Sequence, residues 1–292
     1  MFKGSIVAIV TPFKNGKVDE AKLKELVEFQ IKNGTNGIVP CGTTGESPTL
    51  SNEEHERVIE VCIEAANKRV PIIAGTGSNS TREAIALTKD AAKAGASASL
   101  QVSPYYNRPT QEGLYQHFKA IAESVDIPII LYNIAGRTGV NIEPETVARL
   151  ARDCKNIVAV KEASGSLDQA SATKSLCPKD FILLAGDDSL TLPILAVGGT
   201  GIISVVANIV PRDVAELCKA FDQGNIKKAA EIHYKLFPLI KAMFCETNPA
   251  PVKTAMGLLK MCEPDLRLPL CPLSEKNLER VKKTLHDYGL LT

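Results

Sequence analysis

The chain has 292 residues, of which 45% are apolar and 23% are charged, and its formal net charge is +1. This balance is typical of a globular protein, and it argues against nucleic acid as the main partner because neutralising phosphates needs a basic face. No apolar stretch reaches the roughly 18 residues of a membrane span. The five-residue apolar run before Thr11 and Pro12 predicts a first strand rather than a signal peptide.

Eight short runs of apolar, often β-branched residues follow one another along the first two thirds of the chain. Most are continuous rather than alternating, as expected of parallel strands that are buried on both faces. We therefore expect eight parallel strands, at residues 5–10, 37–41, 71–74, 97–102, 128–132, 157–160, 181–185 and 201–206.

Amphipathic helical patterns separate these runs. Residues 20–33 carry one apolar stripe, and Ser51 with Glu54 forms the pattern of a capping box at the next helix start. Pro144 and Pro211 suit the first turn of later helices. Eight strand–helix units are compatible with an open doubly wound sheet, but their number favours a closed (β/α)₈ TIM barrel.

The region after the barrel pattern contains helical patterns alone, at residues 225–244, 250–261 and 274–288. We therefore predict a catalytic barrel over residues 1–224 and a C-terminal helical appendage over residues 225–292 that packs on it.

The eight cysteines show no C-x-x-C pair and no zinc-like spacing with histidine. This pattern suits free thiols in a reducing, cytoplasmic setting, and no metal or cofactor is expected. A Gly-x-Gly pattern at residues 75–77 lacks the third glycine of a dinucleotide fingerprint, so we reject a nicotinamide site.

Catalytic groups of such barrels come from the carboxyl ends of the strands and the loops that follow. Lys161 comes directly after the buried run 157–160. Desolvation favours a neutral amine, which can attack a carbonyl carbon. The same position also suits a lysine that pairs with Glu162 or extends out of the barrel mouth, and the strand pattern alone leaves both readings open.

Other strand ends carry hydroxyl groups. The loop at residues 41–47 is either a carboxylate site or a tight turn capped by threonines. Tyr105 and Tyr106 could relay protons, although composition favours an interface. Four histidines lie in helical patterns away from the predicted strand ends, and none is expected to act as a base: His55, His117, His233 and His286.

Five motifs in order along the chain resemble the dihydrodipicolinate synthase family of pyruvate-dependent lyases. The resemblance covers essentially the whole chain. The double tyrosine and the arginine of the third motif are typical of the synthase branch. The motifs are CGTTGES at 41–47, SPYYNRP at 103–109, YNIAGRTG at 132–139, VKEASG at 160–165 and GDD at 186–188.

The resemblance implies condensation of pyruvate with L-aspartate 4-semialdehyde to 4-hydroxy-tetrahydrodipicolinate in diaminopimelate and lysine biosynthesis. Lys161 would form the Schiff base, and a proton relay of Thr43, Tyr132 and Tyr106 would serve it. Arg137 would bind the carboxylate of the semialdehyde. The remaining substrate-binding positions implied are Thr44, Gly186 and Ile203.

The family also implies a homotetramer built as a dimer of dimers, in which Tyr106 reaches into the site of a neighbouring subunit. A lysine-binding regulatory site would comprise Ser47, His55, Asn79, Glu83 and Tyr105. Asn52 and Pro48 depart from the residues common in lysine-sensitive members, so inhibition is a hypothesis. Ala135 replaces a common proline, which predicts a looser turn before Arg137.

Two other functions compete with this interpretation. A sister lyase acting on a sugar acid would keep Lys161 and Tyr132 without needing Arg137 and Tyr106 in these roles. A non-catalytic barrel that only binds a ligand would not need the complete lysine–tyrosine–threonine set. Trapping of a pyruvate adduct separates the catalytic readings from the last one.

Overall fold

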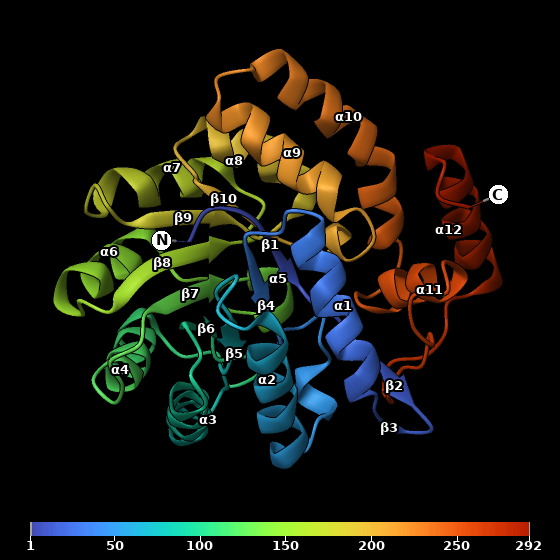
Figure 1. Ribbon diagram of the computed structural model, residues 1–292. Coiled ribbons are helices and arrows are strands. Elements are labelled where there is room, and N and C mark those ends of the chain that lie inside the picture. Colours follow the sequence, from blue (N-terminus) through green and yellow to red (C-terminus); the bar gives the residue numbers. More distant parts are fainter. Residues whose placement is uncertain (1, 292) are drawn as a thin grey trace.

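The computed structural model describes residues 2–291, and its centre is a barrel of eight parallel strands (Figure 1). Around the sheet the order is β4-β1-β10-β9-β8-β7-β6-β5. A parallel bridge between Ile38 and Ile72 joins the two outer strands, so the sheet closes. The strands are β1 (Gly4–Ala8), β4 (Gly37–Val39), β5 (Ile73–Gly75), β6 (Ala98–Val102), β7 (Ile129–Asn133), β8 (Ile157–Glu162), β9 (Ile182–Ala185) and β10 (Gly201–Ser204).

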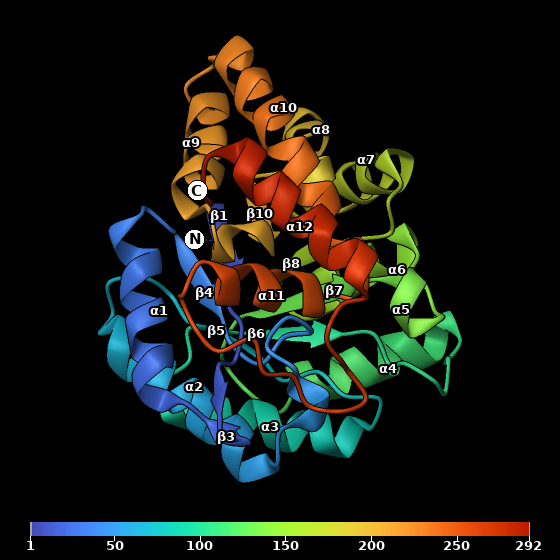
Figure 2. The same ribbon diagram turned by 90° about the vertical axis from the view of Figure 1, so that its right-hand side faces the viewer.

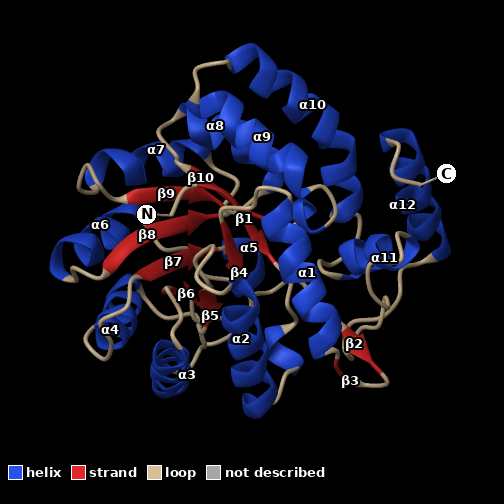
Figure 3. Cartoon of the chain, viewed as in Figure 1, coloured by secondary structure: helices blue, strands red, loops and turns tan. Residues whose placement is uncertain are grey.

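Helices surround the strands on the outside of the barrel (Figure 3). The predicted TIM-barrel fold is therefore confirmed, and each strand begins and ends within two residues of its expected limits. The helices are α1 (Glu20–Lys32), α2 (Asn52–Ala66), α3 (Thr81–Ala94), α4 (Gln111–Ala122), α5 (Ala135–Thr138), α6 (Pro144–Asp153), α7 (Leu167–Leu176), α8 (Thr191–Ala196) and α9 (Pro211–Asp222), with single 3₁₀ turns η1 (Ser47–Thr49), η2 (Asp188–Leu190) and η3 (Val206–Asn208).

The side chains of each strand divide between two cores. Ile6 and Ala8 of β1 belong to the cluster inside the barrel, whereas Val7 between them belongs to the larger cluster under the helices. This alternation follows from the two-residue period of a strand. Alternate residues of a strand therefore face the barrel interior, and the residues between them face the helices.

Local signals in the sequence account for several element limits. Ser51 and Glu54 form the expected capping box of α2, and Pro144 and Pro211 occupy the first turns of α6 and α9. A small hairpin of β2 (Phe13–Lys14) and β3 (Lys17–Val18) was not expected. Asn15 and Gly16 join its strands with positive φ angles, as two-residue hairpin turns require.

Three further helices follow the barrel: α10 (Ile226–Met243), α11 (Ala250–Leu258) and α12 (Glu275–Tyr288). The arrows of β7, β8 and β9 point towards the side of the molecule on which α11 and α12 lie (Figure 1). When the molecule is viewed from that side, α11 lies in front of the strands (Figure 2). Helices α11 and α12 thus lie at the carboxyl ends of the strands, whereas α10 packs against α9 in the helix layer. None of the described helices has the length and apolar character needed to cross a membrane.

Candidate active site

Lys161 lies inside the barrel near the carboxyl end of β8. Its side chain is 6% exposed, and its neighbour by register on β7 is Tyr132, which also faces the interior. The Lys161 Nζ atom lies 3.9 Å from the centre of the Tyr132 ring. Neighbouring parallel strands therefore place the amine against the phenol.

The alternative in which Lys161 pairs with Glu162 is wrong. Consecutive residues of a strand point to opposite faces, so Glu162 faces the helix layer. Its carboxylate accepts hydrogen bonds from the Ser164 N–H (2.6 Å) and from the amide groups of Asn133 and Gln169. Among residues 2–291, Lys161 takes part in no ion pair, and its low exposure excludes a side chain that extends into solvent.

Gly186, directly after β9, leaves room for the lysine stem. A Cβ atom at this position would lie 3.1 Å from Lys161 Cγ and 2.7 Å from Ala163 Cβ, closer than side chains tolerate. On the next strand, Ile203 is 1% exposed and belongs to the same interior cluster as Tyr132. The predicted position Gly186 thus borders Lys161, and Ile203 faces the same barrel interior.

A cavity of about 410 Å³ opens at this end of the barrel. Thr43 from the loop after β4, Tyr132 from β7 and Arg137 from α5 line one part of it. Arg137 is exposed, so its guanidinium is accessible to a ligand. Two hydroxyl groups and a cation therefore line one cavity. Of these three residues, Tyr132 lies against Lys161, which does not itself line the cavity.

Thr44 is buried beside this cavity rather than lining it. In space, Asn248 lies between Thr44 and Arg137 and bonds to both of them. The Asn248 side-chain amide donates to Thr44 Oγ1 (3.0 Å), and the Asn248 carbonyl oxygen accepts from Arg137 Nη2 (3.2 Å). The Asn248 Oδ1 atom is buried and has no hydrogen-bond partner among residues 2–291. Asn248 was missed in the sequence because it lies in the loop before α11, more than 100 residues away from both partners.

Tyr106 does not join the other predicted site residues within this chain. It is 90% exposed and has a φ of 72°. Such left-handed backbone is uncommon for a bulky residue and usually has a functional reason. The loop after β6 therefore projects the Tyr106 ring away from its own cavity.

The residues expected for lysine binding lie in the second part of the same cavity. Ser47, His55, Glu83 and Tyr105 line it, together with Asn52 and Pro48. Asn79 lies behind Tyr105 and donates from its amide to the Tyr105 carbonyl oxygen (3.1 Å). Glu83 is exposed, and its carboxylate accepts a hydrogen bond from Ser78.

The expectation that every histidine lies away from the strand ends is wrong for His55. This residue belongs to α2, but its Nε2 atom lies 2.8 Å from the carbonyl oxygen of Gly75, the last residue of β5. Burial lowers the pKa of His55, and the Gly75 carbonyl partly opposes the shift. Within the described part of the chain, no group of three His, Cys, Asp or Glu side chains could hold a metal ion.

The model of the dihydrodipicolinate synthetase family matches residues 1–288. This chain belongs to that family. The 4-hydroxy-tetrahydrodipicolinate synthase of Syntrophus aciditrophicus is 62% identical over 291 residues, which cover all of both chains. The dihydrodipicolinate synthase of Aquifex aeolicus superposes with a TM-score of 0.98 at 52% identity, covering 99% of each chain. A solved dihydrodipicolinate synthase of Cyanidioschyzon merolae with lysine bound has a TM-score of 0.96 at 42% identity, again over 99% of each chain.

Ala135, where the resemblance leads one to expect proline, begins the short helix α5 that presents Arg137 to the cavity of this family member. The turn is held by the Ile134 carbonyl, which accepts from the N–H groups of Arg137 (3.0 Å) and Thr138 (3.1 Å). Hydrogen bonds of the backbone thus constrain this turn without the proline ring.

Proposed function

We propose that this chain condenses pyruvate with L-aspartate 4-semialdehyde, through a Schiff base on Lys161, to form 4-hydroxy-tetrahydrodipicolinate in diaminopimelate and lysine biosynthesis. Full-length similarity to synthases of this name supports the reaction. The observation that carries the mechanism is the Lys161 amine, buried without a carboxylate partner among the described residues and lying against Tyr132.

The reaction begins when Lys161 Nζ attacks C2 of pyruvate and water leaves, which gives an imine. Loss of a methyl proton converts the imine to an enamine, and its nucleophilic carbon adds to the aldehyde of the second substrate. The amino group of that substrate then closes a ring on C2 and displaces Lys161. Covalent catalysis of this kind divides one difficult step into several easier ones.

Thr43, Tyr132 and Tyr106 carry protons in these steps, since each hydroxyl group both donates and accepts. Thr44 and the Ile203 backbone bind the pyruvate carboxylate, and Gly186 leaves space for the imine. Arg137 binds the carboxylate of the semialdehyde, for which its planar guanidinium offers two parallel donors. The position of Thr43, Tyr132 and Arg137 around one cavity supports these roles.

The first test is consumption of L-aspartate 4-semialdehyde that depends on pyruvate, coupled to the reductase that acts on the product. Borohydride trapping followed by intact-mass measurement tests the Schiff base independently. Lys161→Ala should abolish both the adduct and the rate, whereas Lys89→Ala at an exposed position of α3 should leave both unchanged. Normal turnover by Lys161→Ala would refute the mechanism. An adduct without condensation by the parent chain would direct attention to sugar-acid cleavage.

We further propose that L-lysine binds Ser47, His55, Asn79, Glu83 and Tyr105 and inhibits the reaction. Glu83 supplies the negative charge that a ligand ammonium requires, and this part of the cavity adjoins Thr43. Millimolar lysine should lower the rate, and Glu83→Gln should weaken the inhibition while the rate without lysine persists. A rate that is insensitive to lysine, or inhibition that survives in Glu83→Gln, would exclude this site.

The assembly that we propose is a homotetramer of two dimers, with Tyr106 shared across each dimer. The exposure of Tyr106 supports this arrangement. We place the protein in the cytoplasm, where a reducing environment suits eight unpaired cysteines. Residues 1–224 would form the catalytic barrel, and residues 225–292 would support it.

A further inference from the structure

The loop that carries Thr43 and Thr44 has an unusual backbone. Cys41 and Glu46, at its two ends, both adopt positive φ angles (55° and 54°) although neither is glycine. The N–H groups of Gly45 and of Ser47, the residue after Glu46, both donate to the Gly42 carbonyl oxygen. Residues other than glycine rarely adopt a positive φ angle unless the surrounding structure holds the backbone in place. Contacts outside the loop must therefore maintain its shape.

The principal contact is a fully buried ion pair. Lys253 Nζ of α11 lies 2.6 Å from Glu46 Oε1, and both side chains have no exposed surface. Lys253 also donates to the Thr11 carbonyl oxygen (2.9 Å) and lies 4.2 Å from the centre of the Phe13 ring. The Thr11 hydroxyl in turn donates to the Gly45 carbonyl oxygen (2.6 Å). The ammonium thus links the loop to the segment after β1.

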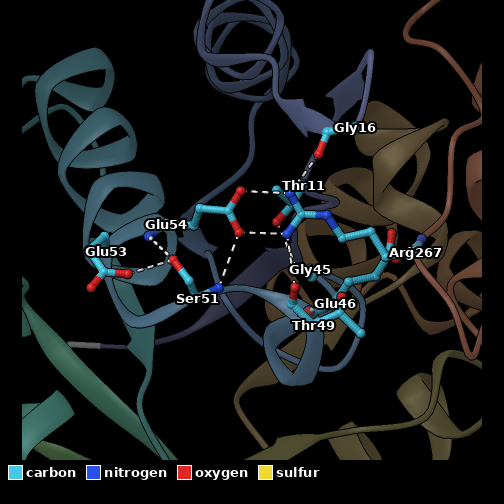
Figure 4. Close-up of polar contacts among 9 residues, drawn as sticks. All are labelled: Thr11, Gly16, Gly45, Glu46, Thr49, Ser51, Glu53, Glu54 and Arg267. Carbon is cyan, nitrogen blue, oxygen red and sulfur yellow. Dashed lines mark hydrogen bonds and ion pairs between the residues drawn. The ribbon is translucent and has the colours of Figure 1, made fainter.

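A second residue of the C-terminal region binds the other side of the same loop. The Arg267 N–H donates to Glu46 Oε2 (3.1 Å), so both carboxylate oxygens of Glu46 are engaged. The Arg267 guanidinium lies between the Glu54 carboxylate and the carbonyl oxygens of Thr49 and Gly16 (Figure 4). This arginine therefore connects the loop with the start of α2 and with the β2–β3 hairpin.

Resting on the proposed function, we propose that Lys253 is a positioning residue, which holds the Thr43–Thr44 loop in its reactive geometry through Glu46. Lys253 does not line the cavity. Five residues earlier in the same segment, Asn248 joins Thr44 to Arg137. The segment from Asn248 to Lys253 thus sets the positions of side chains from two barrel loops, and this is what the helices after the closed barrel contribute to the chemistry.

The test compares Lys253→Met, Glu46→Gln and the double variant with the parent chain, and it uses Lys235→Met as the control. Lys235 forms an exposed ion pair with Asp213 (2.8 Å), so its removal should change neither the rate nor the loop. Each single variant leaves one group buried without its partner, whereas the double variant removes both charges. The double variant should therefore recover the melting temperature of the parent chain without recovering its activity.

A displacement of about 1 Å at a reacting group lowers a rate by about 100-fold, so we expect kcat of the folded double variant to fall by about that factor. The borohydride-trapped pyruvate adduct should still form, because Lys161 is untouched. Hydrogen exchange of the peptide 41–47 should become faster in the double variant. A merely structural role predicts a lower melting temperature in the single variants, with unchanged kcat and unchanged exchange in the double variant.

The exchange measurement does not depend on turnover. Faster exchange of peptide 41–47 together with a lowered kcat supports the proposal. Unchanged exchange, or a double variant with the kcat of the parent chain, overturns it. If the parent chain itself fails to condense the two substrates, the proposed function fails, and exchange of the loop still decides whether Lys253 holds it.

Discussion

The Arg137 side chain is accessible to a ligand and is also held in place by a hydrogen bond. Its guanidinium is exposed at the cavity, yet one nitrogen donates to the Asn248 carbonyl oxygen. A guanidinium held in this way can present its remaining donors to a carboxylate in a fixed orientation. Arg137 belongs to α5, whereas Lys161 is buried within β8. Binding of the second substrate should therefore be separable from formation of the Schiff base.

We predict that Arg137→Ala lowers kcat/KM for L-aspartate 4-semialdehyde by about 100-fold, because hydrogen bonds to charged groups contribute about 1.5–3 kcal/mol. The pyruvate adduct should form as in the parent chain, which intact-mass measurement after borohydride reduction will check. Arg137→Lys keeps the charge without the planar fork and should recover only part of the loss. Loss of the adduct in Arg137→Ala would show that the arginine supports the first step instead.

The elements β9 and β10 are joined at their carboxyl ends by a buried carboxylate. Asp188 is the first residue of η2 and is 4% exposed. Its carboxylate accepts from the Ser204 hydroxyl and from the N–H groups of Val205 (2.9 Å) and Val206 (3.4 Å). These bonds hold the corner that follows Ile203, so the wall of the proposed pyruvate site depends on Asp188.

Burial raises the pKa of Asp188 to about 6, and the hydrogen bonds from Ser204 and Val205 oppose the shift. In the unfolded chain the carboxyl titrates near its ordinary value of about 4. The folded state therefore holds this proton between about pH 4 and pH 6 while the unfolded state does not. The contribution of Asp188 to the free energy of unfolding should therefore fall by roughly 3 kcal/mol as pH rises through this window, and should be level above it.

Denaturant unfolding at fixed protein concentration from pH 4 to pH 7 checks this expectation. Asp188→Asn cannot titrate, so the stability of the parent chain relative to this variant should decrease as pH rises to about 6. A difference between the parent chain and Asp188→Asn that does not change with pH would mean that burial does not raise the pKa of Asp188.

The elements of the barrel were predictable because each local signal agrees with the global arrangement. Continuous apolar runs, capping residues and early prolines all mark the same strand–helix units. The hairpin at residues 13–18 was overlooked although Asn15-Gly16 is a strong turn signal, because its strands have only two residues each. The inward position of Lys161 also follows from alternation, once Ala159 is known to face the interior.

The contacts made by the C-terminal region could not be predicted in the same way. Lys253 lies 207 positions from Glu46 along the chain, and no periodic pattern relates the two. One signal was present: Lys253 is a charged residue within a mainly apolar stretch of α11 that includes Val252 and Ala255. A charge in such a run needs a partner, but the sequence does not say which carboxylate supplies it.

At the scale of the whole molecule, one chain holds an incomplete set of the proposed relay groups. Thr43 and Tyr132 line the cavity, whereas Tyr106 is almost fully exposed on a backbone with positive φ. A two-fold dimer would offer each cavity the Tyr106 of the other chain, because the same patch then faces itself across the axis. Activity should therefore be a property of the pair of subunits.

This arrangement predicts complementation between two inactive variants. Lys161→Ala lacks the amine, and Tyr106→Phe lacks a relay hydroxyl, whose loss should cost about 100-fold in rate. In a mixed dimer, the site that keeps Lys161 receives an intact Tyr106 from the partner. Unfolding and refolding an equal mixture should restore up to about a quarter of the parent activity, since half of the dimers are mixed and each has one complete site. If Tyr106 served its own chain, every site in the mixture would lack one group, and the mixture would stay inactive. Mixing Lys161→Ala with Lys161→Met is the matched control, because no pairing of these two variants supplies the amine.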